Sequence, residues 1–175
     1  MDVPTLQGSL VRLRPVTEAD LPALLAILDE PDVARWWRRD EWERVDEEDA
    51  VTFVIELPDV AAGSGGGTVA GCIQYSEETD PDYSSAAVDI FVGTAAQGRG
   101  VGPDAMRTLI AWLIDVRGHH RLTVDPAVAN ARAVRVYEKL GFRRVGVLRQ
   151  YERVEDGVWR DALLMELLAD EFERA

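Results

Sequence analysis

The residues of this chain whose types and spacing best suit chemistry lie between Val88 and Pro103. An apolar run from Val88 to Val92 contains one acid, Asp89, and three glycines follow at positions 98, 100 and 102. Beyond them, apolar residues recur at helical spacing: Met106, Leu109, Ile110, Leu113 and Ile114. The pattern predicts a strand, a glycine turn and a helix. Because glycine tolerates positive φ and the amides that open a helix attract anions, this turn is suited to hold a phosphate.

Two better-known phosphate loops do not fit this stretch. It lacks the Gly-Lys-Ser/Thr ending of a nucleoside triphosphate loop, and no early βαβ unit with a following acid supports a dinucleotide fingerprint. The alternative is an ordinary glycine turn in front of a helix. Pro103 removes one amide that could have faced a phosphate, although proline is well tolerated in a first helical turn.

A second motif begins at Asn130 and runs to Phe142. Its spacing predicts a helix that Gly141 ends. Asn130 and Tyr137 are seven residues apart, so they lie on one face of that helix. The helix also carries a basic stripe that would suit a phosphate: Arg132, Arg135 and Lys139.

Tryptophans gather near the start of the chain. Trp36, Trp37 and Trp42 occur within seven residues, beside a mixture of charges. They could form a hydrophobic staple for a loop. We favour an aromatic wall of a substrate site, in which a ring faces a sugar or a cation.

An acidic stretch from Ser76 to Tyr83 comes just before the predicted strand at Val88. We expect Glu78 and Asp80 to attract a polyamine, because opposite charges a few Å apart attract each other. For Glu77 and Asp82 we expect a solvated acidic loop.

Composition limits the class of protein. At 175 residues we expect one domain over residues 1–175. The net charge of −13 argues against nucleic acid as a partner and suits a cationic one. Cys72 is the only cysteine, so an internal disulfide is excluded, and we expect its side chain to be buried. His119 and His120 are the only histidines. We expect them at a turn and a strand edge, and they suggest no metal site.

The remaining patterns place the other elements. We expect a first strand over 6–15, and then a helix that Thr17 and Asp20 open and that Pro31 ends. Apolar, β-branched runs predict further strands: 51–57 and 68–74, joined by a glycine-rich tip, and then 120–126, 145–151 and 158–168. Short helices are expected at 43–49 and near the C-terminus. The sequence contains neither an apolar run of membrane-spanning length nor a secretory leader, so we expect a cytoplasmic protein without a membrane partner.

The turn at 97–102, Gln-Gly-Arg-Gly-Val-Gly, resembles the Gln/Arg-x-x-Gly-x-Gly/Ala signature of the GCN5-related N-acetyltransferases (the GNAT family). Asn130 followed by Tyr137-Glu138-Lys139-Leu140-Gly141-Phe142 resembles that family's second motif. The resemblance implies an α/β (α+β) fold, with a mixed, mostly antiparallel sheet of about seven strands and about four helices, splayed at the acetyl-CoA site. It also implies acetyl-CoA as cofactor, held by Phe91, Val92, Gln97, Gly98, Arg99, Gly100, Val101, Gly102, Asn130 and Arg135.

A narrower resemblance is to the aminoglycoside 6′-N-acetyltransferases. It rests on the tryptophan pair, the acidic stretch at 77–81, Asp89, and Asp125-Pro126 ahead of Asn130. It implies an aminoglycoside site lined by Trp36, Trp37, Glu78, Asp80, Asp89 and Asp125. In this scheme Asp89 is the base, Tyr137 protonates the departing thiolate, and the amine attacks directly. The C-terminal run from 146–149 to 159–161 is closer to the ribosomal-protein acetyltransferases.

Three functions therefore stay open. The first is acetylation of an aminoglycoside, a cationic small molecule, with antibiotic resistance as the outcome. The second is acetylation of a ribosomal-protein or other N-terminal α-amine, or of a polyamine, on the same fold. The third is an acyl-CoA-binding module without turnover, which the presence of Asp89 and Tyr137 argues against. Both a monomer and a homodimer are compatible with the sequence.

Overall fold

A computed structural model describes residues 3–39, 50–58, 67–154 and 157–174. Several predicted features lie outside the described residues. They are Trp42, the acidic helix at 43–49, most of the glycine-rich tip at 59–66, and residues 155 and 156 of the turn before the last strand.

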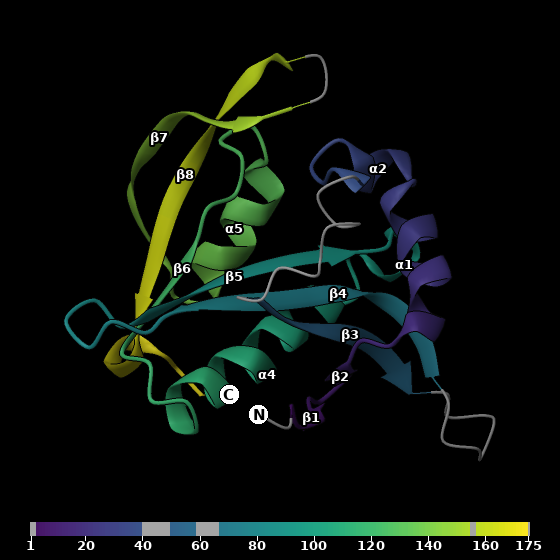
Figure 1. The fold of residues 1–175 in the computed structure, drawn as a ribbon, viewed down its shortest axis with the longest axis horizontal. Coiled ribbons are helices and arrows are strands. Elements are labelled where there is room, and N and C mark those ends of the chain that lie inside the picture. Colours follow the sequence, from purple (N-terminus) through teal and green to yellow (C-terminus); the bar gives the residue numbers. More distant parts are fainter. Residues whose placement is uncertain (1–2, 40–49, 59–66, 155–156, 175) are drawn as a thin grey trace.

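One sheet organises the described residues (Figure 1). Its eight strands are β1 (Leu6–Gln7), β2 (Arg12–Pro15), β3 (Ala50–Pro58), β4 (Gly67–Glu78), β5 (Ser85–Val92), β6 (Arg121–Val124), β7 (Arg143–Arg153) and β8 (Trp159–Leu168). They lie in the order β1-β2-β3-β4-β5-β6-β8-β7. All neighbours are antiparallel except β5 and β6, which are parallel. This is the expected mixed, mostly antiparallel α/β sheet.

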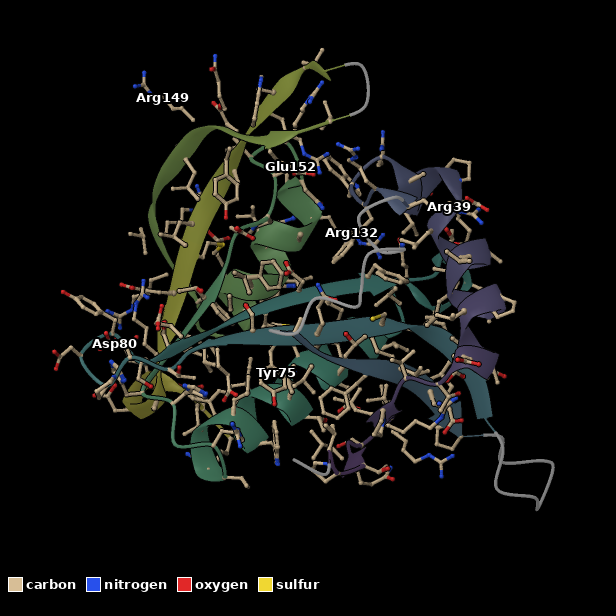
Figure 2. All side chains as sticks on the ribbon, viewed as in Figure 1. Arg39, Tyr75, Asp80, Arg132, Arg149 and Glu152 are labelled. Carbon is tan, nitrogen blue, oxygen red and sulfur yellow. The ribbon has the colours of Figure 1, made fainter. Side chains whose placement is uncertain are left out.

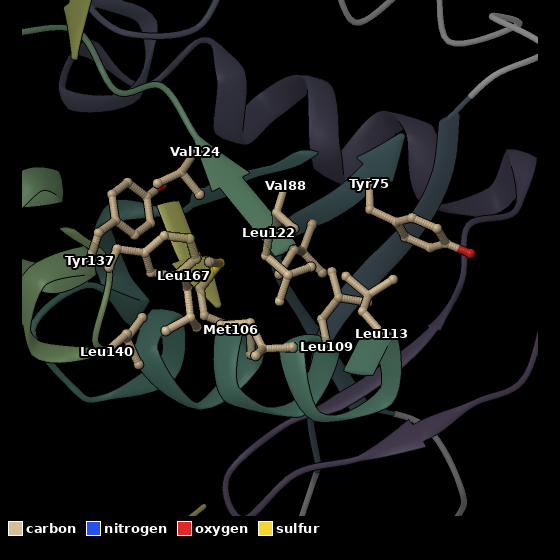
Figure 3. Close-up of a cluster of buried hydrophobic side chains, with 14 of the residues drawn as sticks. Tyr75, Val88, Met106, Leu109, Leu113, Leu122, Val124, Tyr137, Leu140 and Leu167 are labelled. Atoms are coloured by element: carbon tan, nitrogen blue, oxygen red, sulfur yellow. The ribbon is translucent and has the colours of Figure 1, made fainter. Parts of the chain in front are cut away.

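Helices cover both faces of the sheet. They are α1 (Leu21–Leu28), α2 (Pro31–Ala34), α4 (Val101–Asp115) and α5 (Ala131–Lys139), with short 3₁₀ turns η1 (Glu18–Asp20), η2 (Thr94–Ala96) and η4 (Ala169–Glu171). Strand residues alternate between two cores: Phe53 and Ile55 face the core under α4, whereas Val54 between them faces α1. The first core is the larger, and it extends to α5, with Tyr137 at one end (Figure 3).

The expected first strand is a hairpin, so the sheet has eight strands instead of about seven. Leu6 pairs with Leu13 and Gln7 with Arg12. The turn between them is held by Asp104 in the first turn of α4, whose carboxylate accepts hydrogen bonds from the amides of residues 9, 10 and 11 at 2.7–3.2 Å. A side chain nearly a hundred residues away therefore decides where this strand breaks, which local patterning cannot reveal.

The acidic stretch before β5 differs from the expectation. Residues 76–78 extend β4, and Glu77 is not a solvated loop residue. Its carboxylate accepts from Arg117 at 2.7 Å and lies 2.6 Å from Nε2 of His119, which is buried. Burial opposes ionisation of Glu77, but the hydrogen bonds with Arg117 and His119 outweigh it and lower the pKa of Glu77. His119 lies in the connection between α4 and β6, in keeping with the expected turn, and is a buried partner of Glu77.

Smaller differences affect the helix ends. α1 ends at Leu28, before Pro31, and Pro31 opens α2, where a missing amide costs nothing. At the C-terminus β8 continues to Leu168, and in the described residues after it, up to 174, the one helical element is the short turn η4. Cys72 is buried, as expected.

A largely buried ion-pair network joins β2 to β3 and to η1, the turn before α1. Asp20 is 6% exposed and accepts from Arg14 Nη1 and Nη2 at 2.8 and 2.6 Å and from the Thr17 amide at 2.9 Å. The guanidinium of Arg14 also donates to Glu56, which pairs in turn with Arg12. The hydrogen bonds from Arg14, and those from Thr17, hold the pKa of Asp20 well below its usual range.

We expect Asp20→Asn to lower the free energy of unfolding at pH 7 by about 3 kcal/mol, because it leaves Arg14 buried with less compensation. A depressed carboxyl pKa stabilises the fold above the unfolded-state value of about 4, and this stabilisation is lost as pH falls. Urea unfolding from pH 7 to pH 3 should therefore show the gap between the two proteins narrowing below about pH 4. Glu18→Gln, an exposed change on the same turn, is the control. A gap that does not depend on pH would contradict the assignment.

Candidate active site

The sheet opens between β5 and β6. The two strands pair only at Ala86–Leu122 and Ala87–Thr123, and beyond this point they diverge (Figure 1). Asp89 lies two residues past the last paired position of β5. From here to Val92, the side of β5 that faces β6 no longer has a strand beside it. The predicted splay of the sheet is therefore present, with Asp89 where it begins.

Backbone direction identifies which groups of β5 face the opening. The amide of Gly93 donates to Ala70 O on β4 at 2.8 Å. Because amides alternate in direction along a strand, that of Phe91 also points to β4, whereas that of Val92 points to the open side. The Val92 carbonyl agrees with this, since it accepts the side-chain amide of Gln97 at 2.8 Å. The Val92 amide is therefore the backbone donor at this end of β5 that faces the opening.

A cavity of about 610 Å³ occupies the opening. Its walls come from α2 and the residues after it, the end of β5, the glycine turn, the first turn of α4, and one face of α5. This volume is within the range typical of small-molecule sites. The predicted site residues that line it are Trp36, Trp37, Phe91, Val92, Gln97, Gly98, Gly100, Gly102, Asn130 and Tyr137.

The glycine turn has the backbone that an anion site requires. Gly98 and Gly100 have φ of 75° and 82°, a conformation that side chains resist. α4 begins at Val101, so the amides of Val101 and Gly102 open the helix and have no partner within it. The Val101 side chain is buried in the main core, so only its backbone can serve the site. Arg99 is exposed and does not line the cavity.

Arg132 is the basic residue of α5 that reaches the glycine turn. Its Nη1 donates to Oε1 of Gln97 at 2.6 Å, and a Cβ built at Gly98 would lie 4.0 Å from its Nη2. Arg135, the residue chosen from the sequence, is exposed and outside the cavity lining. A three-residue step advances about 300° around a helix, so both arginines cannot face one turn equally.

Asn130 and Tyr137 lie at the two ends of the α5 face that borders the cavity. Asn130 is the N-cap of α5, and its Oδ1 accepts from the Ala133 amide at 3.1 Å. The Tyr137 side chain is buried, and its ring lies 5.8 Å from that of Phe142. Burial, and then the carboxylates of Asp89 and Asp125, raises the pKa of Tyr137 above 10. Its hydroxyl therefore keeps its proton at neutral pH and can donate it.

Tyr151 is a second tyrosine on which Asp125 and Asp89 act, and it was not identified from the sequence. A hydrogen bond to Asp125 raises its pKa to about 12, with smaller contributions from Asp89 and Glu152. Tyr151 follows Gln150, which has a φ of 49° within a β-bulge of β7. The Gln150 amide donates to Asp161 at 2.7 Å, which holds the bulge. Bulges redirect side chains, and no pattern in the sequence marks this one.

The tryptophan pair lines the cavity, but other groups already contact both rings. Trp37 packs edge-on against Phe91, with the ring centroids 5.2 Å apart. Two guanidinium groups lie against the Trp36 ring, that of Arg35 at 5.4 Å and that of Arg160 at 5.9 Å. The aromatic wall is therefore fixed in place by its neighbours.

Glu78 and Asp80 are not brought to this cavity. Glu78 pairs with Ser85, at the end of β5 opposite the glycine turn, and Asp80 follows in the adjoining loop. β5 spans about 25 Å between these ends at the usual rise per residue. Figure 2 shows Asp80 and Arg132 well apart. The carboxylates of Glu78 and Asp80 instead accept hydrogen bonds from backbone amides of their own loop. Glu78 accepts from the Asp80 amide and Asp80 from the Asp82 amide, both at 2.9 Å.

The parts of the chain that the structure describes contain no group of three or more His, Cys, Asp and Glu residues able to hold a metal ion. Nor does any described helix combine the length and apolarity that crossing a membrane requires.

Comparisons with known proteins identify the family of this chain. The family model for the acetyltransferase (GNAT) domain matches residues 11–143. The aminoglycoside N(6′)-acetyltransferase type 1 of Klebsiella pneumoniae is 30% identical over 161 residues, which cover 79% of this chain and 76% of that protein. An acetyltransferase structure from T. thermophilus has a TM-score of 0.81 at 27% identity, covering 98% and 93% of the two chains.

The fold also matches the Vibrio cholerae spermidine N-acetyltransferase, solved with CoA and spermine, at a TM-score of 0.75 and 22% identity over 94% of this chain and 98% of that one. Because the family model spans most of the chain, the protein belongs to the GNAT acetyltransferase family, whose members use acetyl-CoA.

Proposed function

We propose that this protein transfers the acetyl group of acetyl-CoA to a primary amine of an aminoglycoside, the 6′-amine, and so confers antibiotic resistance. The observation that carries the proposal is the buried phenol of Tyr137, which lines the cavity where the sheet opens. Asp89, on β5 where the opening begins, and Asp125 do not line that cavity, but after burial they are the groups that raise the pKa of Tyr137. A protonated phenol with two carboxylates acting on it combines a proton donor with groups that attract ammonium. The Klebsiella relative supports the choice of aminoglycoside.

The residues present fit acetyl-CoA. The helix-opening amides of Val101 and Gly102, with Arg132 beside the turn, would hold the pyrophosphate. Acetyl-CoA supplies an activated acetyl group as a thioester. Tyr137 would lie near the sulfur, and the Val92 amide would donate to the acetyl oxygen as it gains negative charge.

Asp89 would take the proton that the substrate ammonium must lose before its nitrogen can attack. The new C–N bond then forms as the C–S bond breaks, and Tyr137 gives its proton to the departing thiolate. The second proton that the nitrogen loses as it becomes an amide returns to Tyr137 and restores its phenol. No covalent intermediate on the protein is needed. Cys72 is buried and lies outside the cavity lining, in keeping with direct attack.

A thiol-release assay with acetyl-CoA and a panel of amines tests the proposal. We expect CoA release with an aminoglycoside that carries a 6′-amine, and none with its 6′-hydroxyl analogue. Release with spermidine or an N-terminal peptide, but not with the aminoglycoside, would overturn the substrate and favour the alternative amines. Binding of acetyl-CoA without release with any amine would favour a module without turnover.

A further inference from the structure

We propose that Arg160 is a positioning residue that ties the residues after α2 to the β7–β8 hairpin across the mouth of the cavity. The effect assigned to it on the acceptor rests on the proposed function. Arg160 is the second residue of β8, whereas Trp36, the residue it holds, lies beyond α2 in the first quarter of the chain. Neither residue belongs to the cofactor or proton-transfer groups described above.

The guanidinium of Arg160 bridges two parts of the fold. Toward β7, its Nε and Nη2 donate to the two carboxylate oxygens of Glu152 at 2.6 and 2.5 Å. Toward α2, its Nη1 and Nη2 donate to the main-chain oxygens of Arg35 and Trp36 at 3.0 and 2.7 Å. The side chain is 21% exposed, so these bonds are partly shielded from water. Four bonds from one planar group fix both partners at once.

Two further contacts reinforce the bridge. The same guanidinium lies over the Trp36 ring, 5.9 Å from its centroid. Two residues beyond Trp36, Arg38 donates from Nη1 to the Arg153 main-chain oxygen at 2.7 Å, on the β7 side of the hairpin. The segment 35–38 is thus bound to the hairpin at several points, more than a hundred residues away in the sequence. We call this connection the Arg160 clamp.

The position of the clamp gives it a role in the site. The β5–β6 pairs join the two halves of the sheet at the base of the opening, whereas the clamp joins α2 to the outer end of the hairpin (Figure 1). Arg35, Trp36 and Trp37 line the cavity, and Tyr151 precedes the clamped Glu152 by one residue. The clamp therefore fixes the tryptophan wall of the cavity relative to the β7–β8 hairpin.

This role predicts a selective effect. Without the guanidinium, segment 35–37 loses two hydrogen bonds and Glu152 loses its cation, so the acceptor wall is no longer held. The glycine turn, Arg132 and Tyr137 make no contact with Arg160 among those described above. We therefore expect acceptor binding to weaken, while cofactor binding and the chemical step change little. Lysine does not replace arginine here, because a single ammonium cannot match the four-bond geometry.

The test compares Arg160→Lys with Arg121→Lys. Arg121 also pairs with a glutamate of the same sheet, donating to Glu166 at 2.8 Å, but away from the cavity. For Arg160→Lys we expect the KM for the acceptor to rise about tenfold, the effect of losing one charge-assisted hydrogen bond. The kcat and the acetyl-CoA Kd should stay within about twofold. Arg121→Lys should change none of the three. A rise in the acetyl-CoA Kd, or equal effects of the two variants, would overturn the proposal.

Hydrogen exchange supplies a readout that needs no acceptor. The amides of residues 33–38 should exchange faster in Arg160→Lys than in the parent protein, and those of the glycine turn should not. Faster exchange with no turnover on any aminoglycoside would support the clamp and overturn only the proposed substrate. Unchanged exchange at 33–38 would overturn the clamp even if the parent protein acetylates the aminoglycoside.

Discussion

Replacing Tyr137 by phenylalanine is expected to lower kcat about 10²- to 10⁴-fold, the usual contribution of a positioned proton donor. The phenol is buried, and burial with Asp89 and Asp125 raises its pKa above the usual value, so the phenol stays protonated throughout the neutral range. Phenylalanine keeps the ring that packs near Phe142, so the core should be preserved. Steady-state kinetics with a CoA-release readout, together with calorimetric titration of acetyl-CoA, measures the effect.

The acetyl-CoA Kd should change little in this variant, because only a hydroxyl is lost. Tyr151→Phe is the matched control: it removes the second phenol of the group, one that is exposed and outside the cavity lining. It should lower kcat far less. If Tyr137→Phe retains the parent kcat, Tyr137 is not the acid. If Tyr151→Phe has the larger effect, the acid is the residue on the β7 bulge.

The second large effect is expected for Asp89→Asn. Asp89 lies two residues past the last β5–β6 pair and acts on the pKa values of both Tyr137 and Tyr151. An amide cannot accept the proton of the substrate ammonium, so we expect kcat/KM at pH 7 to fall by about 10³-fold. The measurement is the same CoA-release assay with the preferred amine, repeated at higher pH.

Raising the pH distinguishes a base from a group that only binds the substrate. As more of the amine becomes uncharged in solution, the need for a base falls, so the deficit of Asp89→Asn should shrink at alkaline pH. Asp82→Asn, in the exposed loop beyond Asp80, should leave the kinetics unchanged. A deficit that is constant with pH would point to a binding role for Asp89, and turnover near the parent value would remove it from the mechanism.

Sequence patterns predicted the parts of this site that follow from local chemistry. The strand at 88–92, the glycine turn and the helix after it are all present, because their apolar periodicity and glycines act over a few residues. Asn130 and Tyr137 share one helical face, as a spacing of seven requires. The patterns did not reveal which polar residues lie together. Glu78 and Asp80 are close to Asp89 in sequence, yet one strand length keeps them from the cavity.

What the sequence by itself determined is therefore the anion-binding turn, the family motifs and the face of α5 that carries Tyr137. The tertiary structure decided which strands part, that Arg132 instead of Arg135 reaches the turn, that Tyr151 bonds to Asp125, and that Arg160 holds the tryptophan wall. The physical reason is the distance along the chain over which each kind of interaction acts. Backbone conformation and helical periodicity are set within one or two turns of chain, whereas a carboxylate or a guanidinium acts on whatever packing brings within a few Å of it.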